Sequence, residues 1–233
     1  MFPVLVYKKE KRTTMIHIIF TKRFALVLTL CFILTQCLIF YVGAHEAPRL
    51  EPRTPVVMKE FPVDPALFKE DVRPYLQKII ERHGLEEWKA CVLTNELHRH
   101  LGIYSLVGAK MGVRAREILE APFDTVDVIS LAGNQQPLSC MNDGLQVSTG
   151  ASLGRAAITI AHVNQPAAIF LYRDKMATLR TKKEIVNQIQ GDIQAALKKY
   201  GGLNPEYFAH IRKLSLEYWL KWDRKEIFEE IID

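Results

Sequence analysis

The stretch ELHRHLGIYSLVGAKMG, residues 96–112, decides how the rest of the chain is interpreted. Two histidines, His98 and His100, come directly before a run of apolar residues with helical spacing. On a regular helix, side chains two positions apart point in well-separated directions. Both histidines can therefore bind one target only where the chain is extended or where a helix is just beginning. We predict that both lie at a helix entrance and face a common target; the alternative is two unrelated polar residues.

The helix predicted over residues 97–119 is expected to lie at the centre of the fold. Small residues, among them Gly108 and Gly112, form a stripe along it. Small side chains let another backbone approach closely. Leu101 and Met111 supply apolar contacts on the same helix. We therefore expect a second element to pack directly against the small-residue stripe.

The other elements follow from apolar periodicity and from helix start and stop signals. Asp64-Pro65 can begin a helix that is interrupted at Pro74 and stops at Gly84. Alternating or β-branched runs predict strands at residues 125–131, 156–161, 167–172 and 176–179. Further helices are predicted over residues 142–150, over residues 182–200, and from residue 204 toward the C-terminus with a break near residue 223.

The first 44 residues have the pattern of a secretory signal. Lys22 and Arg23 precede an uncharged apolar run over residues 24–42, and small residues follow at 43 and 44. The run is also just long enough to cross a bilayer, so residues 1–44 are predicted to be a cleaved signal peptide or a retained anchor. Proline-rich residues 45–63 are predicted to form a linker. We therefore expect an extracytoplasmic protein that meets a membrane only through its N-terminal segment.

The formal net charge of +5 belongs to this leader. Six of the 31 Lys and Arg residues and one of the 26 Asp and Glu residues lie in residues 1–44, which leaves 25 of each sign in residues 45–233. A strongly basic surface is the electrostatic footprint of nucleic-acid binding. We therefore predict no nucleic-acid partner.

A second group of reactive side chains lies in SCMNDGLQVSTGASLGR, residues 139–155. A helix here would bring the Cys140 thiol and the Asp143 carboxylate to one face. Residues 149–154 would form a turn with exposed backbone N–H groups, which can hold an anion or a carboxylate. Cys91 and Cys140 are the two cysteines after the leader. An oxidising compartment would permit a disulfide between them.

Together, the two stretches resemble the FmdE-type domain family of formylmethanofuran dehydrogenase. A family pattern like His-Gly-His-Leu-Cys-Pro-Gly corresponds to residues 98–104, and one like Cys-x-x-Asp-Gly-Ile-Gln-x-x-Thr-Gly-Cys-Thr-Leu-Gly-Lys corresponds to residues 140–155. The resemblance covers about residues 90–182. Gly102 and Ala151 stand where the family has cysteines, and no cysteine follows Cys140, so the zinc ribbon of some members is absent.

The resemblance implies an α+β fold. Its elements follow in the order helix, strand, helix and three strands, and the strands form one mixed sheet. Extra helices are expected at both ends. The family domain is predicted over residues 64–200, followed by a helical extension over residues 201–233. Members of the family are prone to dimerise, so a homodimer is expected.

The resemblance also implies a metal pocket lined by His98, His100 and Cys140. Two imidazoles and a thiolate suit zinc or another divalent transition metal, and three protein ligands leave a position open. The resemblance further implies a ligand-binding group, and the family's basic residue at position 155 suggests a phosphate or carboxylate partner. This group is Gln146, Thr149, Gly150 and Arg155.

Three functions stay open on these observations. The first is an extracytoplasmic metal-binding protein in an accessory or ligand-binding role. The second is a metal-dependent hydrolase or lyase, with metal-bound water as nucleophile and Asp143 as candidate base. The third is a structural partner protein with a vestigial pocket. The dehydrogenase activity is not carried over, because this chain has a secretory leader and no cysteine-rich cluster motif.

Overall fold

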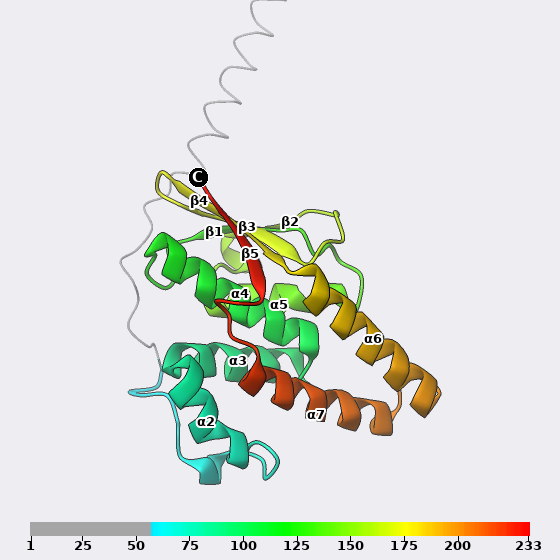
Figure 1. Cartoon of the computed structure of the whole chain (residues 1–233). Helices are drawn as coiled ribbons and strands as arrows, with labels where there is room; N and C mark the ends of the chain where they lie inside the picture. Colours follow the sequence, from blue (N-terminus) through cyan, green and yellow to red (C-terminus); the bar gives the residue numbers. More distant parts are fainter. Residues whose placement is uncertain (1–56) are drawn as a thin grey trace, which may run out of the picture. The chain divides into compact units, whose positions relative to one another are not determined.

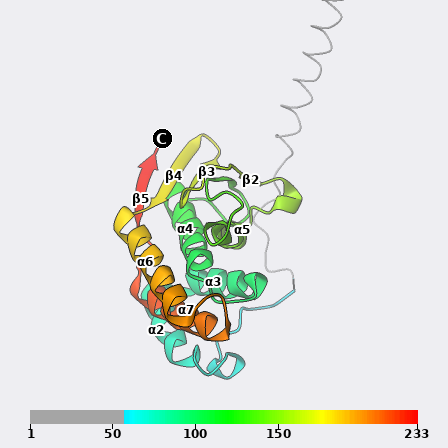
Figure 2. The same ribbon diagram turned by 90° about the vertical axis from the view of Figure 1, so that its right-hand side faces the viewer.

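A five-stranded mixed sheet carries the α-helices on one side in the computed structural model, which describes residues 57–233 (Figures 1 and 2). The strands lie in the order β2-β1-β3-β4-β5. Their bounds are β1 Asp127–Ser130, β2 Ile158–Ile160, β3 Ala167–Tyr172, β4 Lys175–Thr181 and β5 Phe228–Ile232. The predicted leader and residues 45–56 of the predicted linker lie outside the described residues. The α+β fold class is confirmed.

The strand pairing places β1 in the interior of the sheet. β1 and β2 are parallel, with Ile129 opposite Thr159, whereas the other three pairs are antiparallel. The β1–β2 crossover contains the helix α5 (Met141–Thr149), as a parallel connection requires. This crossover brings the predicted second block of reactive residues under the sheet. The four strands predicted from periodicity are confirmed, with shorter bounds for the first two.

Helix α4 (Ile103–Leu119) is buried on almost every side, since 13 of its 17 residues are buried. It lies between the sheet and the lower helices in both views (Figures 1 and 2). Its partner across the small-residue stripe is α5: a Cβ added at Gly108 would lie 2.2 Å from the Met141 carbonyl oxygen. A Cβ at Gly144 would lie 2.3 Å from the backbone nitrogen of Ala109. The predicted close packing against the stripe is confirmed.

Two α-helices and a short 3-10 helix precede α4, and one of the α-helices was not predicted from the sequence. Asp64 caps a short 3-10 helix η1 (Pro65–Leu67), and α2 (Arg73–His83) follows with a proline in its first turn. The predicted division into two helical pieces is confirmed, but the break lies at residues 68–72 and Pro74 lies inside the first turn of α2. The unpredicted helix is α3 (Leu85–His98). Because α3 occupies residues up to 98, the prediction that the central helix begins at residue 97 is wrong, and that helix begins at Ile103.

The C-terminal part of the chain packs α6 (Lys183–Tyr200) and α7 (Pro205–Lys221) against the core and then returns to the sheet. Both helices begin and end where their start and stop residues predicted. α7 ends close to the break predicted near residue 223, but the predicted helical extension over residues 201–233 does not resume after it, because the last residues form β5, which pairs with β4. Glu230 on β5 accepts two hydrogen bonds from Arg114 of α4.

A buried ionic cluster joins this C-terminal segment to the helices. The Lys110 ammonium lies 2.5 Å from the Glu87 carboxylate and donates to the Trp222 carbonyl at 2.8 Å, and both charged side chains are fully buried. Arg224 donates to the second Glu87 oxygen at 3.0 Å and also to Glu117. A buried charge is tolerated where it is paired and hydrogen-bonded. The cluster thus ties α3, α4 and the segment after α7 together.

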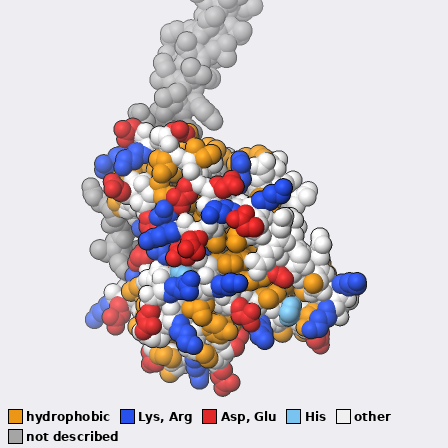
Figure 3. All heavy atoms as spheres, in the orientation of Figure 1, with side chains coloured by type: hydrophobic (Ala, Val, Ile, Leu, Met, Phe, Trp, Pro, Cys, Tyr) orange, Lys and Arg blue, Asp and Glu red, His pale blue; other side chains and the backbone are white. Residues whose placement is uncertain are grey.

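The described surface carries both signs of charge. On the face seen in Figure 3, Lys and Arg side chains alternate with Asp and Glu side chains, and apolar side chains lie among them. No helix within residues 57–233 is long and apolar enough to cross a membrane.

Candidate functional site

His98 and His100 meet at the junction between α3 and α4. His98 is the last residue of α3 and His100 lies in the short link that follows, so the prediction that both lie at the entrance of α4 is correct for His100 alone. Between them, Arg99 has φ = 68°, in the left-handed region. This turn brings the two imidazole rings to a centroid distance of 4.2 Å with a tilt of 41°. The expected backbone irregularity is present and sets the pair side by side.

The two ring nitrogens of His98 have different surroundings. Nδ1 lies 2.7 Å from Oδ2 of Asp143 on α5. Because an ionised carboxylate can only accept, Nδ1 carries the proton of this bond. Nε2 is buried and has no hydrogen-bond partner among the described residues. In the neutral ring, Nε2 therefore presents a lone pair that nothing within residues 57–233 uses.

His100 lies beside this lone pair and stays partly accessible. Its ring packs edge-on against Phe208 of α7, with 5.6 Å between centroids. Burial of part of the ring, followed by the positive charge of a protonated His98, lowers the pKa of His100. A Cβ added at Gly102 would lie 3.2 Å from His100 Nε2 and 3.4 Å from His98 Cδ2. Gly102, the position of a family cysteine, thus directly adjoins both rings.

Cys140 lies at the end of the short helix η2 (Leu138–Cys140), immediately before α5. Burial, together with the negative charge of Asp143, raises the pKa of its thiol to about 11. Both Cys140 and the buried Cys91 are free thiols, so the disulfide that the sequence permitted is not formed. Within residues 57–233 no group of three or more His, Cys, Asp or Glu side chains is arranged as a set of metal ligands.

The structure thus brings together three of the predicted site residues. The His98 ring lies against the His100 ring and is hydrogen-bonded to Asp143. Cys140 lies one helical turn before Asp143, on the same side of α5. The part of the prediction that concerns metal binding stays a prediction.

The predicted ligand-binding residues lie at the other end of α5, and their polar groups are bonded within that turn. Gln146 accepts a hydrogen bond from the Leu153 nitrogen at 3.1 Å. Thr149 is buried and donates to the Leu145 carbonyl. Gly150 ends α5 with φ = 81°, and Arg155 donates to its carbonyl and pairs with Asp124. That these four residues bind a ligand also stays a prediction.

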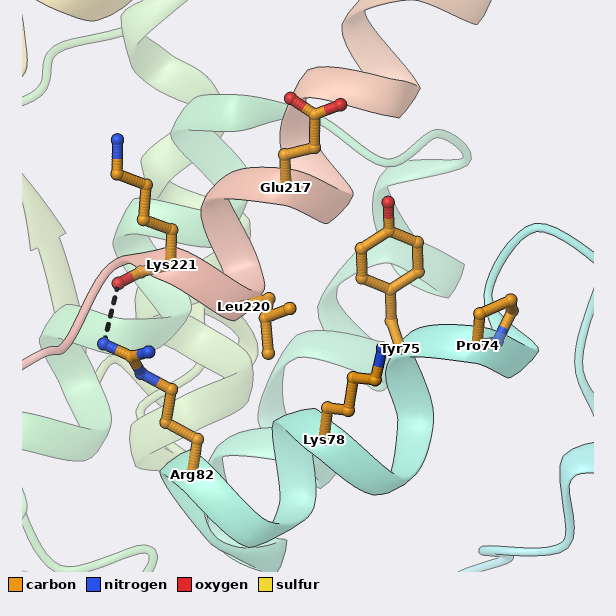
Figure 4. A pocket seen from close by; sticks show the side chains of 7 residues that line it. All are labelled: Pro74, Tyr75, Lys78, Arg82, Glu217, Leu220 and Lys221. Atoms are coloured by element: carbon orange, nitrogen blue, oxygen red, sulfur yellow. Dashed lines mark hydrogen bonds between the residues drawn. The ribbon is translucent and has the colours of Figure 1, made fainter.

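A cavity of about 420 Å³ opens beside His100. Its lining comes from η1 and the residues after it, from α3, from the α3–α4 link and from α7, and it includes Phe68, Lys69 and Trp219. Sequence patterns did not reveal it, because its wall joins residues far apart in the chain. A larger hollow of about 640 Å³ lies between α2 and α7, where Arg82 donates to the Lys221 carbonyl (Figure 4). No histidine or cysteine lines that hollow, whereas His100 lines the smaller cavity.

Comparisons with known proteins found a similar crystal structure and a family model that matches the chain. A crystal structure described as that of a tungsten formylmethanofuran dehydrogenase FmdE-like protein from Syntrophus aciditrophicus is 15% identical, with a TM-score of 0.41. The match covers 63% of this chain and 71% of that chain. No curated protein matches the chain. The family model described as "FmdE, Molybdenum formylmethanofuran dehydrogenase operon" matches residues 97–229, which is more than half of the chain. The chain therefore belongs to the FmdE family.

Proposed function

We propose that this FmdE-family protein works outside the cytoplasm and binds a divalent transition metal, with zinc as the first candidate, through His98, His100 and Cys140. Its role would be that of an accessory or ligand-binding protein. The observation that carries the proposal is the buried Nε2 lone pair of His98, held in place by the 2.7 Å contact between Nδ1 and Asp143. Ligating histidines commonly give their other ring nitrogen to a carboxylate in this way.

The residues present fit such a metal in type. A neutral imidazole nitrogen is a ligand of zinc and related metals, and His100 supplies a second imidazole whose ring centroid lies 4.2 Å from that of His98. When bound, the metal would supply Lewis acidity toward a ligand at its open position. The contact with His98 favours an orienting role for Asp143 over the role of general base.

The protonation state of the Cys140 thiol should differ between the metal-bound and the metal-free protein. With a thiol pKa of about 11, the side chain is protonated at neutral pH in the absence of metal. Metal coordination deprotonates a ligating thiol. Cobalt loading should therefore give a thiolate-to-metal absorption band in the wild type, and Cys140→Ser should abolish this band.

The decisive experiment measures metal in protein purified without a metal-chelating tag. Elemental analysis and native mass spectrometry should find about one metal ion per chain in the wild type. His98→Ala and His100→Ala should each lose the metal, while His162→Ala, which removes an exposed histidine between β2 and β3, should keep it. Asp143→Asn should weaken metal binding by about 10- to 100-fold.

Circular dichroism separates loss of the metal from loss of the fold. The helical signal of each variant should match that of the wild type, because α4 is held by its packing against α5. Wild-type protein without stoichiometric metal after gentle purification would exclude the proposal. Loss of metal in one histidine variant but not in the other would show that the pair does not act together.

A further inference from the structure

The cavity beside His100 has the dimensions and lining of a small-molecule site. Its volume of about 420 Å³ lies within the range of such sites. Phe68, Val72, Leu101 and Trp219 give it apolar walls. Trp88 stacks behind Trp219 at a centroid distance of 4.9 Å, so this wall is rigidly supported.

The charged side chains of the lining favour an anion. They are Lys69, Arg99, Arg212 and Glu96. The guanidinium of Arg212 is committed to Asp71 through two hydrogen bonds. Arg99 and Glu96 lie 4.0 Å apart and are both largely exposed, a geometry in which an ion pair contributes little. Lys69 forms no ion pair within residues 57–233, although its charge acts on the Asp71 carboxylate that Arg212 binds. The three cationic side chains of the lining thus face two carboxylates, Glu96 and Asp71, so positive charge prevails at the cavity.

Much of this cavity is built by residues that the family model does not match. The matched segment begins at residue 97. Eight lining residues precede it: Leu67, Phe68, Lys69 and Val72, and on α3 Cys91, Val92, Asn95 and Glu96. This wall therefore lies outside the segment that the family model matches, and it meets that segment near His100.

We propose that this cavity binds an organic carboxylate with an apolar body. The apolar body would lie against Phe68, Val72 and Trp219, and the carboxylate would lie toward Lys69, Arg99 and the accessible edge of His100. This ligand class belongs to the ligand-binding role proposed above and rests on that role.

Octanoate is a suitable probe, and octanamide is its uncharged counterpart of nearly the same shape. Calorimetry and tryptophan fluorescence, to which Trp219 contributes directly, should show saturable binding of one octanoate per chain. Octanamide should bind at least about tenfold more weakly. Lys69→Gln and Arg99→Gln should each weaken octanoate binding about fivefold, as expected for one partly exposed charged contact.

Lys78→Gln is the matched control, because Lys78 is an exposed lysine on α2 that lines the other hollow (Figure 4). Octanoate binding to this variant should equal that of the wild type. Val72→Phe, which fills the cavity, should reduce binding further than either charge variant does. Equal binding of octanoate and octanamide, or an equal loss in Lys69→Gln and Lys78→Gln, would overturn the proposal.

Each titration is carried out on metal-depleted and on metal-loaded protein. Absence of saturable octanoate binding in both forms overturns the carboxylate site and leaves the metal proposal intact. Octanoate binding by a protein that retains no metal supports the carboxylate site and overturns the metal proposal. The two proposals therefore fail separately.

Discussion

Gly108 on α4 shows how one missing side chain sets the distance between two helices. A Cβ at this position would lie 2.2 Å from the Met141 carbonyl oxygen, and backbone cannot move aside cheaply. Gly108→Ala should therefore lower the free energy of unfolding by about 1–3 kcal/mol, the usual cost of overpacking. Urea unfolding of the variant and the wild type measures the difference.

Gly191 on α6 supplies the control for this prediction. It is exposed and helical, and a Cβ there would meet no atom within 4 Å. Gly191→Ala should stabilise the protein by up to about 1 kcal/mol, because alanine has the higher helix propensity. A Gly108→Ala protein as stable as the wild type would mean that α4 and α5 are farther apart than the structure places them.

His83 should make stability depend on pH. Burial, followed by the nearby positive charge of Lys110, lowers its pKa from 6.5, although Glu87 and Asp223 act in the opposite direction. The unfolded chain therefore takes up the proton first as pH falls. Stability should decline as pH drops below about 7 and level off below the folded-state pKa.

His83→Gln isolates this contribution, since a glutamine amide can still donate to the Leu220 carbonyl that the ring contacts at 2.9 Å. Free energies of unfolding measured between pH 7 and pH 5 should fall less steeply in the variant than in the wild type. An identical slope in the two proteins would show that His83 does not titrate differently on folding.

The histidine pair could be predicted from the sequence, but its geometry could not. Spacing and block resemblance singled out His98 and His100 and required an irregular backbone. That irregularity is the left-handed conformation of Arg99, and arginine has no marked preference for it. The pairing of His98 with Asp143 spans 45 residues, a contact that only the packing of α5 against α3 and α4 creates.

Elements with strong local signals were predicted well, and those that depend on distant partners were not. α6 and α7 have clear start and stop residues, and their bounds were predicted within about two residues. α3 buries Glu87 and Thr94 as well as apolar residues and has no single apolar stripe, so periodicity did not reveal it. β5 has the sequence FEEII, which is as compatible with the end of a helix as with a strand. Its pairing with β4, a contact between distant residues, makes it a strand.

Removing β5 should therefore damage the whole domain. Deletion of residues 228–233 removes the buried Phe228 side chain and the Glu230 partner of Arg114. The loss of Phe228 burial alone should cost about 2 kcal/mol, which thermal and urea unfolding would detect. Ile232→Thr changes an exposed side chain on the same strand and should shift stability by less than about 0.5 kcal/mol. A deletion as mild as this substitution would mean that β5 is dispensable.

For the molecule as a whole, the leader pattern predicts export. Fractionation should recover the protein outside the cytoplasm, with His45 as the new N-terminus if the leader is cleaved, or in the membrane fraction if it is retained. Replacing Leu28 and Leu30 of the apolar run with arginine should trap the protein in the cytoplasm, because charge in that run opposes insertion. Full-length soluble wild-type protein in the cytoplasm would contradict the prediction.

The buried ionic cluster also makes the domain fold as one unit. Lys110 receives one partner from Glu87, before it in the sequence, and the other from the carbonyl of Trp222, which lies 112 residues after it. Without Trp222 the buried ammonium would lose one of its two partners, and a buried charge is tolerated only where it is paired and hydrogen-bonded. The central helix can therefore be enclosed only once the segment after α7 has reached it, which couples the first helices of the domain to the last.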